Sequence, residues 1–163
     1  MSGPLRYDFA PLDGITRGVF RRVWRRRFGG ADRLFIPFFS PTPQHVFTNR
    51  DRRELEAANN PSGAALVPQV MTRLPGDLIW AAGICRDLGY REVNLNLGCP
   101  SGTVTAKGKG AGFLADPEAL DRFFDSYCGA LPLPLSVKAR IGFGKRRSFP
   151  GSWRSSTATL SPP

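Results

Sequence analysis

Cys99 stands in a sequence context that suits chemistry better than packing. It follows a run in which apolar residues alternate with Asn94 and Asn96, and this alternation predicts a strand with two unlike faces. An unpaired buried amide costs about 2 kcal/mol or more, so the two asparagines are expected to face a polar site. Gly98 ends the strand and Pro100 fixes the turn. The thiol is therefore expected at a strand end, where parallel α/β folds place their active sites.

The thiol of Cys99 has two interpretations. The first is a buried structural cysteine, which is a common use of this residue. The second is an acid, because a free thiol is mostly protonated at neutral pH and can donate a proton. The strand end, the flanking glycine and proline, and the glycine-rich segment that follows favour the second interpretation.

Two further predicted strand ends carry polar side chains. Gln69 and Lys138 each stand near the end of a predicted strand, as Asn96 does. In the last predicted strand Ser136, Lys138 and Arg140 share one face. A lysine on an inward strand face is costly unless an anion meets it. The three strand ends together predict a shared ligand.

Strand and helix patterns alternate along the chain. Short apolar runs between turn residues predict strands, and apolar residues at intervals of three and four predict helices. The alternation predicts parallel βα units with right-handed crossovers, in either a barrel or an open sheet. The predicted strands are 7–11, 33–39, 65–70, 92–97 and 135–141, and the predicted helices are 16–28, 51–58, 74–88 and one that begins at 116–117.

The helix predicted over residues 16–28 is amphipathic and rich in arginine. Thr16 is its expected N-cap. Its apolar face is expected to join the core, and its arginine face to lie in solvent or against a polyanion. In the later helices, Cys85 and Cys128 are expected to pack as small hydrophobic side chains. The apolar face is Val19, Phe20, Val23 and Trp24, mostly opposite Arg17, Arg21, Arg22, Arg25 and Arg26.

The composition excludes several classes of protein. A chain of 163 residues, 41% of them hydrophobic, can form one domain with a core. It has no apolar run of about 18 residues, so no membrane span is predicted, and no secretory pattern at its start, which favours the cytoplasm. The odd count of 3 cysteines argues against a disulfide framework. The net charge of +10 suits a polyanion such as RNA, with a solvated basic surface as the alternative.

Metal and phosphate-loop chemistry are not predicted. The sequence has no CxxC pair and a single histidine, His45, so no zinc site is expected. His45 has no acidic partner nearby in sequence, which favours a loop residue over a base or a ligand. The segment after Cys99 lacks the glycine that a Walker motif requires, because that position is Lys107. We expect this segment to be a mobile lid that carries Lys107 and Lys109 toward phosphates.

Four segments of the chain resemble the tRNA-dihydrouridine synthases, in the order that this family has them. They are 10–16, 67–70, 94–114 and 136–142, and the likeness runs from about residue 7 to residue 144. The resemblance implies a TIM-type α/β barrel, of which residues 1–144 would supply about the first five βα units. It also implies FMN as the cofactor, NADPH as the reductant and tRNA as the partner, in the reduction of uridine to 5,6-dihydrouridine.

The resemblance also implies a role for each strand end. Gln69 would hydrogen-bond the flavin ring, Lys138 would lie beside its pyrimidine edge, and Cys99 would be the general acid. An ammonium group at that edge stabilises the negative charge of a reduced flavin. The backbone groups that would line the flavin belong to Pro11, Leu12 (where the family often has Met) and Asp13. The residues that would contact the substrate are Asn96, Lys107, Lys109 and Arg140.

The composition changes at about residue 145. Residues 145–163 contain no acidic residue and are rich in serine, threonine and proline, which predicts disorder. Our hypothesis is a truncated or frameshifted barrel, with a native flexible tail as the alternative. Besides a synthase, the chain could be a catalytically dead fragment with residual RNA affinity, or another FMN barrel reductase that acts on a free pyrimidine. A complete barrel of this kind is expected to be a monomer.

Overall fold

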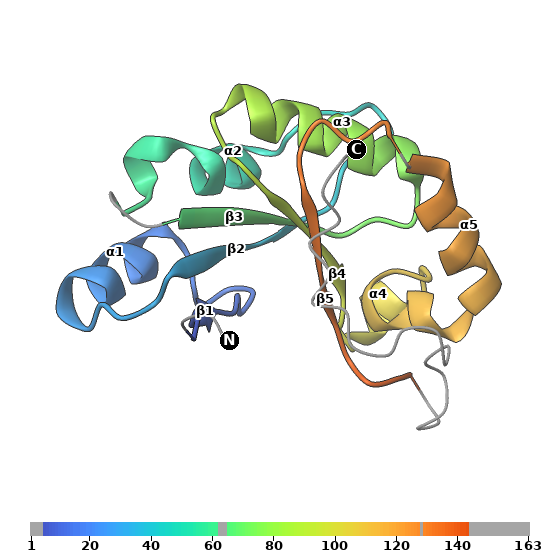
Figure 1. The fold of residues 1–163 in the computed structure, drawn as a ribbon, viewed down its shortest axis with the longest axis horizontal. Coiled ribbons are helices and arrows are strands. Elements are labelled where there is room, and N and C mark those ends of the chain that lie inside the picture. The colour runs from blue at the N-terminus through green and yellow to red at the C-terminus, as the bar shows by residue number, and fades with distance from the viewer. Residues whose placement is uncertain (1–4, 62–64, 128, 144–163) are drawn as a thin grey trace.

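Five parallel strands form one sheet, in the order in which they occur along the chain. The computed structural model describes residues 5–61, 65–127 and 129–143. Each strand pairs in parallel with the next (Figure 1). The second and third strands have the predicted bounds, whereas the first is shortened to 2 residues. The strands are β1 (Asp8–Phe9), β2 (Arg33–Phe39), β3 (Ala65–Val70), β4 (Val93–Leu97) and β5 (Leu135–Ala139).

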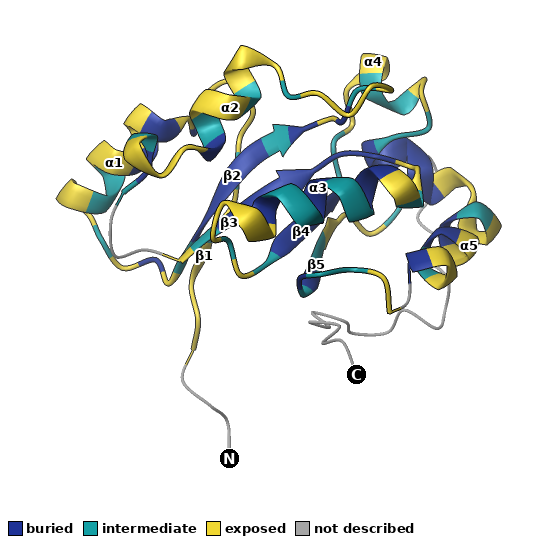
Figure 2. Ribbon diagram, turned by 90° about the horizontal axis from the view of Figure 1, so that it is seen from above, coloured by how far each residue is buried: buried dark blue, intermediate teal, exposed yellow. Residues whose placement is uncertain are grey.

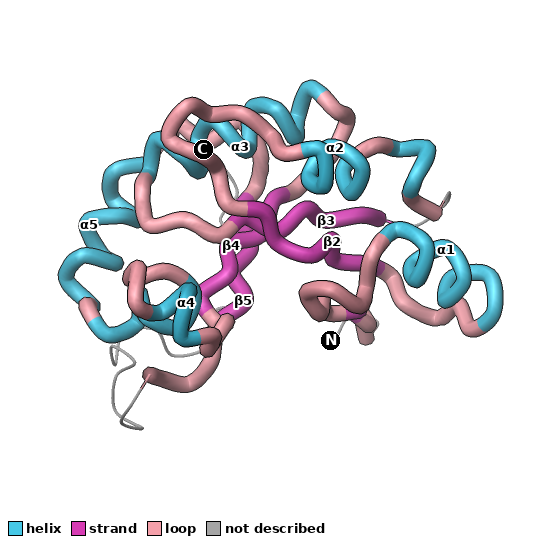
Figure 3. The backbone as a smooth tube through the Cα atoms, turned by 180° about the vertical axis from the view of Figure 1, so that it is seen from behind, coloured by secondary structure: helices cyan, strands magenta, loops and turns pink. Residues whose placement is uncertain are grey.

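Helices connect the strands and lie around one side of them (Figure 3). Their order confirms the prediction of consecutive parallel βα units, which form about half of an α/β barrel. No helix in the described ranges is long and apolar enough to cross a membrane. The helices are α1 (Gly18–Arg27), α2 (Asn49–Leu55), α3 (Pro75–Asp87), α4 (Gly102–Thr105) and α5 (Pro117–Tyr127), with 3-10 turns η1 (Ala57–Asn59) and η2 (Gly110–Ala115).

The core lies between the sheet and helices α3 and α5, where Figure 2 shows β2, β3 and β4 as buried. Leu78, Ala82 and Cys85 of α3 are fully buried, as their spacing predicts. Burial raises the pKa of the Cys85 thiol to about 12, so this thiol stays protonated and packs as a small hydrophobic group. Cys128 and residues 144–163 lie outside the described residues, so the predictions for them stay predictions.

The predicted core face of α1 lies outside the main core, although its Phe20 and Trp24 pack against Phe9 of β1. Val19 and Val23 are 65% and 46% exposed, and Phe20 is also exposed, whereas Arg21 is only 1% exposed. Figure 2 shows α1 as a largely exposed helix at the edge of the sheet. Helical periodicity identifies side chains that share a face, but it does not determine which face packs. Arg21 is the most buried side chain of α1, because its guanidinium group finds enough acceptors to replace water.

Arg21 anchors α1 to the segment after α2. Its guanidinium donates to Asn60 Oδ1 (3.0 and 2.6 Å) and lies 3.0 Å from a carboxylate oxygen of Glu54. Burial lowers the pKa of Arg21, and the charge of Glu54 opposes that effect. Gly18 makes the close approach possible, because a Cβ at this position would collide with the backbone oxygen of Asn59.

Thr16 does not cap α1. The helix begins at Gly18, and Arg17 is in the N-cap position. The Thr16 hydroxyl instead donates to the carbonyl oxygen of Leu12 (3.1 Å) and accepts from its N–H (2.9 Å). These bonds close the turn that follows β1, which carries the predicted flavin-lining residues.

Candidate active site

The ends of β3, β4 and β5 bring polar side chains into one hydrogen-bonded network. The strand register pairs Gln69 with Asn94 and Asn96 with Lys138. Gln69 donates to Asn94 Oδ1 (2.7 Å) and accepts from Asn96 Nδ2 (2.7 Å), and Asn94 Nδ2 donates to Ser136 Oγ (2.9 Å). The polar face predicted for β4 therefore exists, and its amides largely satisfy one another. Since Gln69 is buried in this network, its contact with a flavin ring stays a prediction.

Asn96 fixes the backbone that carries Cys99. Its Oδ1 accepts hydrogen bonds from the backbone N–H groups of Gly98 (3.0 Å) and Cys99 (2.9 Å). Asparagine often closes a turn in this way, because its short side chain reaches the backbone just ahead of it. Asn96 is only 7% exposed and also bonds Gln69. It therefore supports the turn in this structure, and its predicted contact with substrate is not shown. The Cys99 thiol is half-buried and free.

The segment after Cys99 packs back against it. Ala111 N donates to the carbonyl oxygen of Cys99 (2.9 Å), and a Cβ at Gly110 would come within 2.8 Å of that oxygen. Residues 110–114 are buried. Residues 110–112 of the predicted lid are therefore packed in this structure, and the mobility of the segment stays a prediction. Lys107 is exposed and Lys109 half-buried, in the turn that precedes them.

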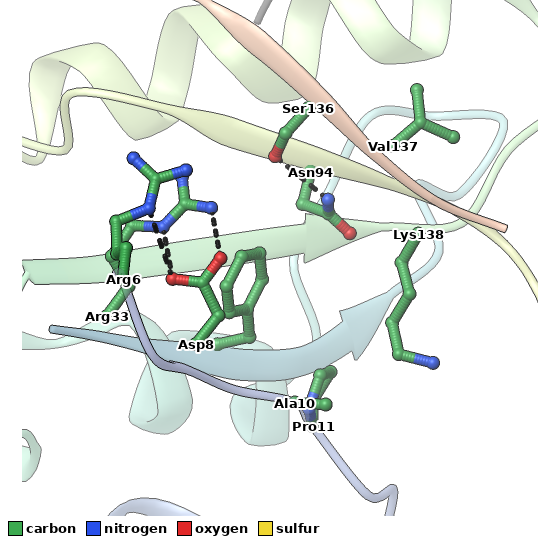
Figure 4. Close-up of a pocket in the computed structure, with 10 residues that line it drawn as sticks. Arg6, Asp8, Ala10, Pro11, Arg33, Asn94, Ser136, Val137 and Lys138 are labelled. Atoms are coloured by element: carbon green, nitrogen blue, oxygen red, sulfur yellow. Dashed lines mark hydrogen bonds and ion pairs between the residues drawn. The ribbon is translucent and has the colours of Figure 1, made fainter. Parts of the chain in front are cut away.

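An open cavity of about 220 Å³ lies along the polar face of the sheet. At the strand ends it is lined by Ala10, Pro11 and Lys138 (Figure 4). Figure 4 shows Lys138 extending from β5 on the side of the sheet where Ala10 and Pro11 lie. Lys138 is exposed, and no described residue forms an ion pair or a hydrogen bond with its side chain. The cavity thus contains a cation that could meet an anionic ligand.

An ion-pair cluster lines the opposite end of the cavity through Asp8 and Arg33. Arg33 donates to both carboxylate oxygens of Asp8 (2.8 and 2.5 Å) and to Glu92 (2.5 Å). The hydrogen bonds from Arg33 hold the pKa of Asp8 below its usual value. Asp8 and Glu92 in turn raise the pKa of Arg33. These charges offset one another. Among the described cations that line the cavity, both arginines pair with Asp8, whereas Lys138 has no carboxylate partner.

The turn after β1 places the other predicted cofactor residues beside the cavity. Leu12 and Asp13 are exposed and do not line it. Asp13 forms an ion pair with Arg50 of α2. Arg140 directly follows β5 and is exposed. The structure therefore brings Pro11, Asn96, Cys99 and Lys138 to one end of the sheet, while the ligand contacts of Leu12, Asp13 and Arg140 stay predictions.

The sequence did not indicate the partners of His45. His45 Nε2 lies 3.1 Å from Asp77 Oδ1, and its ring stacks on Trp80 with centroids 4.9 Å apart. Thr72 Oγ1 also donates to Asp77 (2.7 Å). His45 and Asp77 are 32 residues apart, so only the packing of the loop after β2 against the first turn of α3 brings them together. In the described part of the chain, no group of three or more His, Cys, Asp or Glu side chains could hold a metal ion.

Comparison with known proteins agrees with the family resemblance. A family model described as "Dihydrouridine synthase (Dus)" matches residues 8–149, which is most of the chain. The chain belongs to the dihydrouridine synthase family. Its half-barrel is consistent with the barrel fold of that family.

Relatives within the dihydrouridine synthase family are longer than this chain. The tRNA-dihydrouridine(16) synthase of Escherichia coli K12 is 39% identical over 146 residues, which cover 85% of this chain and 46% of that protein. The probable tRNA-dihydrouridine synthase 1 of a Synechocystis strain is 30% identical over 135 residues, which cover 82% of this chain and 37% of that protein. The chain thus spans less than half the length of these curated relatives.

Proposed function

We propose that this chain carries the catalytic part of a tRNA-dihydrouridine synthase, which uses FMN and NADPH to reduce uridine in tRNA to 5,6-dihydrouridine. The strongest support is the position of Cys99, which Asn96 holds at the strand ends that also carry Lys138. The names of the relatives and the net charge of +10 also favour an RNA substrate. We place the reaction in the cytoplasm and expect the complete barrel to act as a monomer.

The residues at the strand ends fit the ring end of a flavin. Lys138 is exposed at the cavity without a described partner, so its ammonium group can meet the negative charge of a reduced ring. Pro11 lines the same cavity, and backbone groups of Leu12 and Asp13 would extend that surface. FMN, when bound, would supply the hydride that adds to C6 of uridine.

Cys99 would supply the proton that adds to C5 of the same uridine. A half-buried thiol on a fixed turn can donate from one defined position. The target base must leave its stack to reach this position. The cations that would contact the surrounding RNA are Lys107, Lys109 and Arg140.

A second candidate is a catalytically inactive fragment that retains affinity for RNA. The observation that favours it is the open sheet, in which β1 and β5 each have one edge without a described partner strand. Val19 and Val23 are also exposed beside β1. Barrel strands gain stability from closure, so an open half-barrel could lose its cofactor and keep its basic surface.

The proposed function is tested in a chimera that supplies the remaining strands. Residues 1–143 are joined to the C-terminal part of the E. coli relative, and flavin content, NADPH oxidation and dihydrouridine formation are measured. Cys99→Ala is expected to keep the first two and to lower dihydrouridine formation about 100-fold or more, as for loss of a general acid. Cys85→Ala, which removes a buried thiol of α3, is the control and should stay active. Absence of product from the unmutated chimera would refute the function, and near-normal product from Cys99→Ala would refute the role of Cys99.

A further inference from the structure

Arg73, in the loop after β3, lies directly on the turn that carries Lys107 and Lys109. A Cβ at Gly108 would come within 2.8 Å of Arg73 Nη1 and within 3.7 Å of two other atoms of that side chain. Gly108 also has a positive φ of 63°, a conformation that favours glycine. The glycine between the two lysines therefore leaves room for a third cation.

The backbone that presents Arg73 is held on both sides. Thr72 Oγ1 accepts from Leu74 N (3.0 Å) and donates to Asp77 Oδ2 (2.7 Å). The other oxygen of Asp77 lies 3.1 Å from His45 Nε2. These contacts tie the loop after β3 to helix α3 and to the loop after β2. Arg73 thus projects from a supported turn.

The positive charges at this point lack acidic partners. In the described ranges, no carboxylate forms an ion pair with Arg73, Lys107 or Lys109, and Arg73 is exposed. Like charges held close together repel one another, and a bound anion relieves that cost. Gly110, two residues after Gly108, packs against Cys99. The cationic group therefore lies at the rim of the candidate active site.

We propose that Arg73, with Lys107 and Lys109, binds a phosphate of the RNA strand that presents its base to Cys99. This inference rests on the proposed function and adds to it a positioning residue. The guanidinium group offers paired donors that match phosphate geometry, which two flexible lysines do not. None of the three residues lines the cavity, and Arg73 and Lys107 are exposed, which suits contact with a polymer backbone. A phosphate held there would fix the position of the neighbouring nucleotide.

The experiment measures binding of an unmodified, fluorescently labelled tRNA transcript to the 163-residue chain by fluorescence anisotropy, at several salt concentrations. Arg73→Ala is expected to weaken binding about three- to tenfold and to reduce the magnitude of the slope of log K against log salt by about 0.7–0.9, the range for one phosphate contact. Arg73→Lys should restore the slope and only part of the affinity. Arg91→Ala removes an exposed arginine that lies just before β4, at the other end of the sheet, and serves as the matched control. Circular dichroism and thermal melting verify that each variant folds.

Each outcome separates this inference from the proposed function. If Arg73→Ala binds like Arg91→Ala, with the same salt slope, the inference is wrong even if the chimera makes dihydrouridine. If Arg73→Ala shows the expected loss while the chimera makes none, the RNA contact stands and the proposed reaction fails. If poly-glutamate displaces the labelled tRNA as well as unlabelled RNA does at equal charge, the site does not distinguish phosphate from carboxylate. The inference then also fails.

Discussion

Asn96 connects three parts of the candidate site through one side chain. Its oxygen holds the N–H groups of Gly98 and Cys99, and its nitrogen holds Gln69 on the neighbouring strand. An aliphatic side chain could make none of these bonds, and a carboxylate would lose the donor to Gln69. The position of the thiol therefore depends on this amide, although Asn96 itself is almost completely buried.

Replacement of Asn96 by alanine should loosen the turn at Cys99. The change leaves two N–H groups and one amide oxygen unpaired, so the free energy of unfolding is expected to fall by about 1–3 kcal/mol. In a Cys128→Ser background, Cys99 should react faster with a thiol reagent, while the buried Cys85 stays protected. Asn59→Ala, which removes a half-buried side chain whose amide bonds Glu56 and lies away from Cys99, is the control. Unchanged stability and an unchanged Cys99 reaction rate would contradict this role.

At the scale of elements, α1 is held by polar contacts and by the absence of a side chain at Gly18. The buried Arg21 and the backbone of Gly18 face the segment after α2, where Asn59 and Asn60 lie. Val19 and Val23 of α1 are exposed, whereas Phe20 and Trp24 contact Phe9 of β1. The short β1 contributes only two register pairs, and the Gly18 contact adds to the aromatic contacts of Phe9 in holding α1 beside it.

Two glycine-to-alanine changes should have opposite effects. Gly18→Ala puts a methyl group into the backbone of Asn59 and should destabilise the protein by about 1–3 kcal/mol, as overpacking does. Gly83 lies within α3, and a Cβ added there would meet no heavy atom of another segment within 4 Å. Gly83→Ala should stabilise by about 0.5–1 kcal/mol through helix propensity. Urea unfolding of both variants measures the difference, and equal changes in stability would contradict the packing described for α1.

At the scale of the molecule, the described sheet has two edges. The sheet order places β1 at one edge and β5 at the other, with no described strand beyond either. Exposed apolar side chains lie near both, among them Ile15 after β1 and Ile141 after β5. The residues that would contact FMN gather at the ring end of the cofactor. Barrels commonly bind phosphate through the loops after strands seven and eight, and the described residues contain five strands.

The chain by itself is therefore expected to hold FMN weakly. Each missing contact to a charged phosphate costs roughly 1.5–3 kcal/mol, so several missing contacts lower affinity by orders of magnitude. The 163-residue chain is purified, and its flavin absorbance is compared with its protein concentration. The expected ratio of bound flavin to protein is well below one. A soluble yellow monomer with close to one FMN per chain would show that five strands suffice.

The sequence by itself determined the order of the strands and of the four longer helices, the bounds of β2 and β3 and the family, because these follow from local periodicity and from motifs within short segments. It also placed Cys99 at a strand end. Only the tertiary structure decided which face of α1 is buried, which acid meets His45 and where Arg73 lies. Those outcomes depend on contacts between segments far apart in sequence, and a local pattern carries no information about which partner it will meet.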